Sequence, residues 1–346
     1  MNPTTSQRKP YGLFLSIIAG IFLLQSCVSN LIYRKKHSDS EVVPVAVDDN
    51  NPFYNWPFQT SAEKVWDLIH TDLALNVHFD SSSIDGYATL TLKPHFYSQD
   101  SLVLDAVNME IYEVLTHIEE SKGGVNGSNV FIPPPTRLTF NYRQNKKLVV
   151  YFNETIIANQ PVSIRIQYSA TPGKKDTTWI NTENEAISDD IGMYFINAEG
   201  KNPTKPTQMW TQGEPQSNCH WFPTLDAPNQ KHTQRISITF PGNMQSLSNG
   251  ELKSSVDMYG NNGSHSRTDV WVQNKPHAPY LTMLAVGNWV RVKDSLPWPI
   301  DPNLRKKETL PIEYLVEPQF KDDAKMIFGN TPEMIQFFSQ YTGVKY

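Results

Sequence analysis

The sequence has few of the features that would assign it a chemistry at once. Two cysteines among 346 residues exclude a disulfide-rich scaffold. The chain contains no Gly-x-Ser-x-Gly, phosphate-binding loop, dinucleotide fingerprint or Cys-x-x-Cys, and no two of its nine histidines stand four residues apart. Its basic residues are scattered and form no stripe interleaved with aromatics, so we expect no nucleic-acid partner.

The composition that is present indicates a β-rich protein. At 346 residues the chain is long enough for about two domains, and 39% hydrophobic residues suffice for a sizeable core. Twenty-five prolines, 11% aromatic residues and only 19% charged residues favour short strands and turns over a helical bundle.

Residues 1–27 have the pattern of an export signal. Arg8 and Lys9 precede the apolar stretch Gly12–Leu24, and the following Leu24–Cys27 resembles a bacterial lipobox, with Cys27 as the lipidated residue. An uncleaved anchor is the alternative, but thirteen residues are short against the roughly 20 of a spanning helix. We therefore expect a lipid-anchored protein of the bacterial cell envelope, facing the periplasm or the cell surface, with residues 28–55 as a flexible tether.

Short strands follow from residue 56 onward. Leu73, Leu75, Val77 and Phe79 alternate with polar or small residues, which places four apolar side chains on one face of a strand. A turn at 83–86 and a second alternating run predict a hairpin. Six further runs predict more strands: 102–104, 148–152, 162–168, 236–240, 270–272 and 280–286. Without intervening helices, these runs predict antiparallel, sandwich-like sheets.

The last 39 residues (308–346) have a different pattern. Residues 311–318 predict one more strand, and Thr331-Pro332 predicts the start of a helix, with Thr331 as the N-cap. Met334, Phe337, Phe338 and Tyr341 lie at helical spacing and form an apolar face. A segment this short cannot build its own core, so this face needs a partner and the chain is expected to end inside a domain.

One segment, residues 210–228, carries a specific signature: Thr211-Gln212-x-Glu214, then Phe222-Pro223-x-x-Asp226-x-Pro228. It resembles the segment by which zinc aminopeptidases of the aminopeptidase N family, which include leukotriene hydrolase, recognise the free amino terminus of a substrate. Several other segments resemble the same family in the same order: 68–80, 86–92, 100–106, 191–195, 280–288 and 327–334.

The resemblance implies a saddle-like β domain over residues 56–307. It further implies that 308–346 are the first strand and helices of a truncated, thermolysin-like α/β catalytic domain. The family's zinc-binding His-Glu-x-x-His is absent, so we expect no metal ligand and no catalytic residue in this chain and one zinc in the full-length enzyme. The expected partners are peptide amino termini, the missing catalytic domain and, through the lipid, a membrane.

The resemblance assigns the substrate contact to Glu214, whose carboxylate would face the α-ammonium group of the substrate. The alternative is an inert, solvated loop glutamate before Pro215. Gln212 would brace the loop or border the first substrate pocket. Gly213 stands where larger residues are common in relatives, and would either loosen the pocket wall or allow a backbone turn.

Other residues of the segment have structural interpretations. Asp226 is expected to cap a local turn, and Trp221 and Phe222 to be core residues that hold the loop. Cys219 and His220 are neighbours on an extended segment and would point to opposite faces, so they do not predict a dyad. The acidic residues between 183 and 190 lack the order of a calcium loop.

The sequence therefore predicts the amino-terminal part of a membrane-tethered zinc aminopeptidase, inactive as this isolated chain. The alternative is a non-catalytic β-sandwich lipoprotein that binds peptides or proteins.

Overall fold

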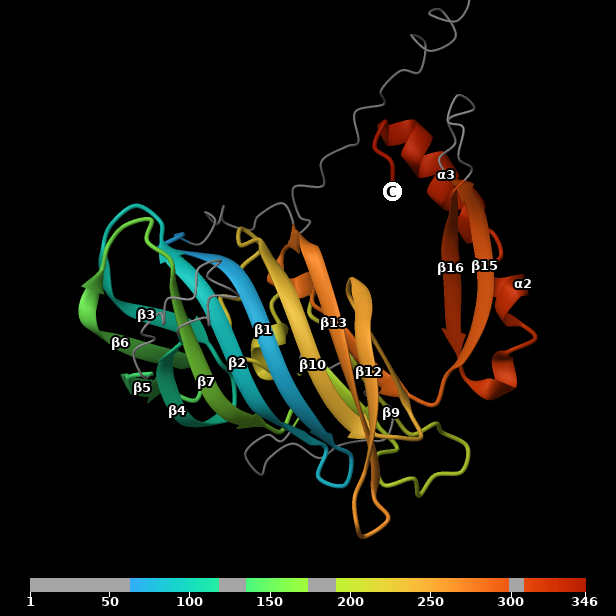
Figure 1. The fold of residues 1–346 in the computed structure, drawn as a ribbon, viewed down its shortest axis with the longest axis horizontal. Helices are drawn as coiled ribbons and strands as arrows, with labels where there is room; N and C mark the ends of the chain where they lie inside the picture. The colour runs from blue at the N-terminus through green and yellow to red at the C-terminus, as the bar shows by residue number, and fades with distance from the viewer. Residues whose placement is uncertain (1–62, 118–134, 174–190, 299–307) are drawn as a thin grey trace, which may run out of the picture. The chain divides into compact units, whose positions relative to one another are not determined.

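A computed structural model describes residues 63–117, 135–173, 191–298 and 308–346, which are mainly β, as the sequence predicts (Figure 1). Cys27, the tether and the acidic residues at 183–190 lie outside these ranges. No helix within them is long and apolar enough to cross a membrane.

The largest sheet has seven strands, and its order along the sheet differs from the order in the chain (Figure 1). In sheet order these are β12 (Glu251–Tyr259), β13 (His265–His277), β10 (His232–Pro241), β1 (Trp66–His78), β2 (Ser83–Pro94), β7 (Val162–Ala170) and β4 (Met109–His117). Within this sheet only β1 and β10 pair in parallel; the other neighbours are antiparallel. Buried and exposed residues alternate along β1, β2 and β10, so one face of the sheet covers the core.

The predicted hairpin of β1 and β2 is confirmed, but its turn lies earlier than residues 83–86. The turn is made at residues 79–82, where Ser82 has φ of 49°, and Ser83 already pairs with His78. Gly86 is a strand residue with φ of 149°, and a Cβ there would lie 1.9 Å from the carbonyl oxygen of Ala74. This glycine therefore permits a close approach of two strands and does not form the turn.

Three smaller sheets accompany the large one. The four-stranded sheet has the order β11 (Gln245–Ser248), β14 (Leu284–Gly287), β9 (Gln208–Thr211) and β8 (Met193–Ile196). The three-stranded sheet has the order β3 (Gln99–Asp105), β6 (Lys147–Ile156) and β5 (Thr139–Arg143). The last sheet is the antiparallel pair β15 (Val290–Trp298) and β16 (Glu308–Val316), which lie on either side of the boundary expected at residue 307.

One buried cluster joins strands of the seven-, four- and three-stranded sheets. It includes Leu90 of β2, Leu104 of β3, Leu284 of β14 and Trp221 and Phe222 of the 210–228 segment, all 0% exposed. Trp221 and Phe222 are therefore core residues, as the sequence predicts. Full burial of such side chains contributes about 1.5–3 kcal/mol each.

The predicted strand at 280–286 begins later than expected. A short 3-10 helix, η2 (Pro279–Leu281), occupies its first part, and β14 begins only at Leu284. Pro279 has no N–H to give to a ladder. Its carbonyl accepts a hydrogen bond from the Asn218 side chain, which also holds this segment away from a strand geometry.

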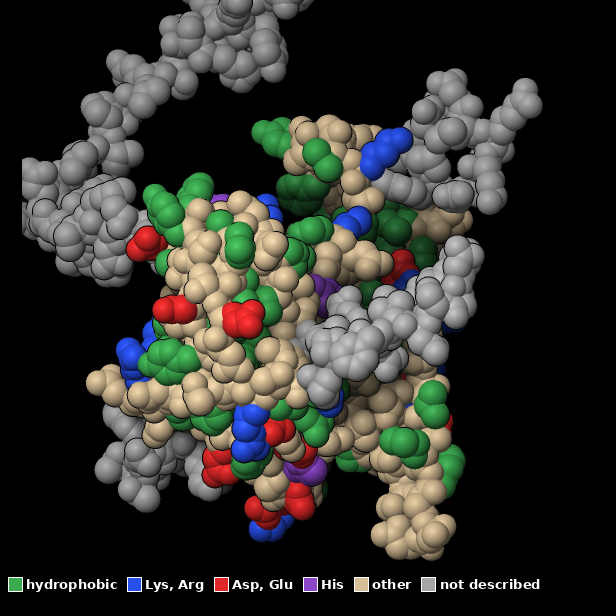
Figure 2. All heavy atoms as spheres, turned by 60° about the vertical axis from the view of Figure 1, so that its left-hand side comes forward, with side chains coloured by type: hydrophobic (Ala, Val, Ile, Leu, Met, Phe, Trp, Pro, Cys, Tyr) green, Lys and Arg blue, Asp and Glu red, His purple; other side chains and the backbone are tan. Residues whose placement is uncertain are grey.

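The C-terminal region contains η3 (Pro318–Phe320), α2 (Ala324–Phe328) and α3 (Thr331–Thr342). The N-cap of α3 is Asn330, so Thr331 is the first helical residue and donates its hydroxyl to the carbonyl of Phe328. The predicted apolar face of α3 is present and exposed, and no residue of this helix is buried. On the molecular face drawn in Figure 2, acidic and basic side chains are interspersed.

Candidate functional site

The 210–228 loop, defined as residues 210–228, leaves the four-stranded sheet at the end of β9. The backbone N–H of Gln212 donates to the carbonyl of Gly192, and that of Ser217 donates to the carbonyl of Gly213, at 2.9 and 2.8 Å. The hydroxyl of Thr211 accepts from the N–H of Leu284 at the start of β14. The first part of the loop is thus fixed to two neighbouring segments.

Asn218, in the 3-10 helix η1 (Asn218–His220), is the central connection of the loop. It is 0% exposed, and its amide nitrogen donates to the carbonyls of Pro279 and Thr282 at 2.6 and 3.1 Å. Its amide oxygen accepts from the indole N–H of Trp221 at 2.7 Å. One buried side chain therefore ties the loop to η2 and to its own core anchor. The sequence reasoning missed this residue, because its partners lie up to 64 positions away.

Gly213 occupies a position that has no room for a side chain. A Cβ there would lie 2.3 Å from the carbonyl oxygen of Tyr280 and 2.5 Å from the amide nitrogen of Asn218. The glycine is buried, so it permits a close approach between the loop and η2 and does not loosen a pocket wall.

Replacing Gly213 with alanine should lower the free energy of unfolding by about 1–3 kcal/mol, because the loop must move away from Tyr280. Urea denaturation followed by circular dichroism measures this. Gly263→Ala is the control: its Cβ meets nothing within 4 Å and its φ is +81°, so only backbone strain of about 1 kcal/mol is expected. A smaller loss at Gly213 than at Gly263 would contradict the close-packing account.

Glu214 and Gln212 differ from the rest of the loop. Both side chains are exposed, and within the described residues neither makes a hydrogen bond or an ion pair. The backbone on both sides of Glu214 is held by the contacts above. The structure therefore presents a carboxylate and a carboxamide, two residues apart, on a rigid support.

Asp226 braces the loop from its far end. Its carboxylate accepts from the backbone N–H of Cys219 at 2.9 Å, and its own N–H donates to the carboxylate of Asp105 at 3.1 Å. It therefore bonds to backbone, as expected, but to a segment seven residues upstream and not to an adjacent turn. Burial raises the pKa of Asp226 to about 6, and the Cys219 N–H opposes this shift.

The raised pKa of Asp226 predicts a pH-dependent stability. In the folded chain the carboxyl holds its proton up to a pH of about 6, whereas in the unfolded chain it ionises near 3.9. Its favourable contribution is complete below the unfolded pKa and is lost as pH rises through 6.

We expect Asp226→Asn to gain stability over the wild type by about 2 kcal/mol between pH 4 and pH 7, because the asparagine never ionises. Thermal melts of both proteins at each pH measure the difference in stability between them. The contributions of the other titrating groups are the same in both proteins and cancel in this difference. The exposed Asp100→Asn protein is measured alongside as a surface control. A difference between Asp226→Asn and wild type that does not change with pH would exclude a raised pKa.

Cys219 has a structural place in the loop. It is buried, its thiol donates to the carbonyl of Gln216 at 3.3 Å, and it forms no disulfide within the described residues. Cys219 and His220 lie in η1 and not on an extended segment.

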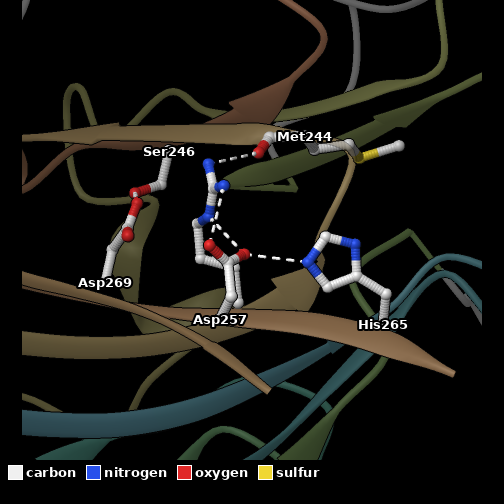
Figure 3. Close-up of polar contacts among 6 residues, drawn as sticks. Met244, Ser246, Asp257, His265 and Asp269 are labelled. Carbon is white, nitrogen blue, oxygen red and sulfur yellow. Dashed lines mark hydrogen bonds and ion pairs between the residues drawn. The ribbon is translucent and has the colours of Figure 1, made fainter. Parts of the chain in front are cut away.

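A second polar cluster lies on β12 and β13 (Figure 3). The Asp257 carboxylate accepts from Arg267 and His265, and the hydrogen bond from Arg267 is the main cause that lowers its pKa. Nearby, Ser246 of β11 donates to Asp269 and accepts from the indole of Trp271. These contacts join β11, β12 and β13, so we assign this cluster to the stability of the sheets.

The described residues contain no group of three or more His, Cys, Asp or Glu that could hold a metal ion. The zinc site of a peptidase therefore does not fit this part of the chain. The fold and the loop define a β domain that presents two polar side chains from a rigid support.

Comparison with known proteins assigns this domain to a family. Residues 68–281 match the family described as the Peptidase M1 N-terminal domain. The chain belongs to the M1 peptidase family through this domain.

Sequence relatives include leucine aminopeptidase 2 of Vanderwaltozyma polyspora, 27% identical over 64% of this chain and 28% of the relative. Glutamyl aminopeptidase of Rattus norvegicus is 21% identical over 89% of this chain and 28% of the relative. Transcription initiation factor TFIID subunit 2 of Schizosaccharomyces pombe is 23% identical over 60% of this chain and 18% of the relative. The chain spans less than a third of the length of these curated relatives.

Solved structures show the same fold. A two-domain M1 zinc metallopeptidase bound to L-tryptophan aligns with a TM-score of 0.57 at 18% identity, over 82% of this chain and 55% of the other. Yeast LTA4 hydrolase aligns with a TM-score of 0.52 at 21% identity, over 84% of this chain and 39% of the other. The expected aminopeptidase-type β domain is thereby confirmed.

Proposed function

We propose that this chain is the amino-terminal part of a zinc aminopeptidase that removes amino-terminal residues from peptides. Its contribution is to hold the free amino terminus of the substrate at Glu214. The observation that carries this proposal is the contrast within the 210–228 loop: Glu214 is exposed and without a partner in the described structure, while the surrounding loop is fixed by buried contacts.

Glu214 acts by accepting hydrogen bonds from the substrate ammonium group. A charge-assisted hydrogen bond contributes about 1.5–3 kcal/mol. An internal peptide bond, or an acetylated terminus, offers no positive charge at this point. Gln212 borders the same position and can both donate to and accept from the first residue of the substrate. Because the loop backbone is already held, little ordering is needed when the peptide binds.

No step of peptide hydrolysis is assigned to the described residues, because they contain no group of three or more His, Cys, Asp or Glu that could hold a catalytic zinc. In the proposed enzyme a following domain supplies the metal, which activates water and polarises the scissile carbonyl. The exposed apolar side chains of α3, among them Met334, Phe337 and Phe338, support a packing partner of this kind. As an isolated chain, residues 1–346 are proposed to be inactive.

The amino-terminal region supports a membrane tether. We propose that Cys27 is lipidated after removal of the signal, and that residues 28–55 connect the lipid to the β domain at the bacterial cell envelope. This would place the enzyme where it meets peptides outside the cytoplasm.

The test compares two proteins: the 346-residue chain and the product of the complete reading frame that contains it. Each is assayed for release of an amino-terminal residue from an aminoacyl reporter substrate, before and after chelation and after zinc is restored. We expect activity only in the complete product, its loss on chelation and its return with zinc. If the complete product is folded but shows no zinc-dependent activity, the proposal fails.

A second candidate function is a non-catalytic binding module. It is favoured by one observation: the match to a relative named as a subunit of a transcription initiation factor and not as a peptidase. A complete product that binds peptides with free amino termini, yet never cleaves them at any zinc concentration, would favour this candidate.

A further inference from the structure

Two histidines, one buried and one partly buried, stand together at one end of the large sheet, where β13 leads into the η2 segment that contacts the 210–228 loop. His232 is the first residue of β10 and His277 the last residue of β13, and the two stand directly opposite each other in the antiparallel ladder. Their ring centroids are 4.9 Å apart, with the planes inclined by 47°. His232 is 0% exposed.

The ring nitrogens of this pair are poorly satisfied by the described residues. The carbonyl of Ala278 can only accept, so His277 carries its proton on Nδ1 and donates it over 2.9 Å. This leaves the lone pair on His277 Nε2, which is buried without a partner among the described residues, as are both ring nitrogens of His232. A neutral His232 has one N–H and one lone pair, and a backbone interaction with Thr233 favours its protonated nitrogen. The lone pairs of His277 and His232 have no donor among the described residues, and an ion or a water molecule would satisfy them.

The separation of the two rings is compatible with an ion. Two imidazoles that bind one Zn²⁺ at about 2.0–2.1 Å in a tetrahedral arrangement have centroids roughly 5 Å apart, close to the separation observed here. Histidine ligands of metals commonly donate their second ring N–H to a backbone carbonyl, as His277 does to Ala278.

We propose that His232 and His277 form a binding site for a divalent transition-metal ion, in the first instance Zn²⁺, independent of any catalytic metal. Gln234 lies on the same buried face of β10, two residues along the strand, and is the candidate for a third ligand. Its side-chain oxygen is buried and has no partner in the described structure. Imidazole nitrogens suit Zn²⁺, Cu²⁺ and Ni²⁺, whereas Mg²⁺ and Ca²⁺ prefer oxygen ligands.

The protonation state of the pair is suited to metal binding. Burial, together with the neighbouring His277 and His70, lowers the pKa of His232 to about 3, and a backbone hydrogen bond with Thr233 opposes this shift. Burial also lowers the pKa of His277. Both imidazoles are therefore neutral at pH 7, as ligands must be.

An ion at this site would stabilise the support of the 210–228 loop. His277 and Ala278 lead directly into η2, whose Pro279 carbonyl is bound by Asn218. The ion would fix the chain just before η2, and Asn218 holds η2 itself through the carbonyl of Pro279. This role is structural and does not depend on the proposed peptidase activity.

The test is metal binding by the 346-residue chain, purified in detergent and freed of metal by chelation. Zn²⁺ is titrated by calorimetry and Co²⁺ by visible absorption, which reports nitrogen coordination. We expect one ion per chain, with binding lost in His232→Gln and in His277→Gln. The control is His78→Gln. His78 pairs with Asp85 on the surface, and this pair is the alternative place where an added metal ion could bind. This control should retain binding.

If a variant fails to fold, as judged by circular dichroism, the site is tested in the wild-type protein instead. In a zinc-soaked crystal, anomalous diffraction at the zinc edge should give a peak between the two rings. A water molecule there without anomalous signal, an absence of binding by the wild type, or undiminished binding in a folded His232→Gln protein would each overturn the proposal.

Discussion

Replacing Glu214 with glutamine in the product of the complete reading frame should lower kcat/KM for a peptide with a free amino terminus by roughly 10- to 100-fold. Glutamine has nearly the same shape but carries no charge, so the charge-assisted hydrogen bond to the ammonium group weakens by about 1.5–3 kcal/mol. The fold should be unaffected, because the Glu214 side chain is exposed and contacts no partner in the described structure.

The matched control is Glu199→Gln, which removes an exposed glutamate that pairs with Lys201 on the surface. Steady-state kinetics with a dipeptide reporter should give wild-type kcat/KM for this control. If Glu214→Gln and Glu199→Gln behave alike, Glu214 is the inert loop glutamate that the alternative interpretation describes.

Replacing Asn218 with alanine should lower the free energy of unfolding by about 3 kcal/mol or more. The change leaves the carbonyl of Thr282 and the indole N–H of Trp221 without the Asn218 side chain, whereas the carbonyl of Pro279 keeps its hydrogen bond from the Thr282 N–H. Each unsatisfied buried group costs about 1–3 kcal/mol, and the lost side chain also leaves a small cavity. Urea denaturation at pH 7 measures the loss.

Asn262→Ala is the control for Asn218. Asn262 lies in the exposed turn between β12 and β13 and accepts one hydrogen bond from the N–H of Ser264. Its replacement should change the stability by no more than about 0.5–1 kcal/mol. An Asn218→Ala protein as stable as this control would show that the loop is not held through Asn218.

The strands could be predicted from the sequence because their signals are local. Alternation at Leu73, Leu75 and Val77 places these side chains in the core, and the Asn262-Gly263 pair marks the turn between β12 and β13. The family resemblance was likewise carried by contiguous residues of the 210–228 loop. Local patterns sufficed for the strands and for membership of the family.

The contacts that hold the loop could not be predicted in this way, because they join positions far apart in the chain. Asp226 donates its backbone N–H to the carboxylate of Asp105, which lies 121 residues away in the chain. The short helix η2 takes the place of the expected strand where Asn218 binds the carbonyl of Pro279. The sequence predicts that Gly213 either loosens a pocket wall or allows a backbone turn, yet it packs against Tyr280. A single sequence does not reveal which segments meet, so the roles of these residues follow only from the structure.

The central claim, that Glu214 recognises a free amino terminus, is tested most directly by one ratio. This is kcat/KM for a peptide reporter with a free amino terminus divided by kcat/KM for its N-acetylated counterpart, measured in the wild-type complete product and in Glu214→Gln. The account predicts a high ratio in the wild type that falls by roughly 10- to 100-fold in the variant. An unchanged ratio in a folded, active variant would contradict it.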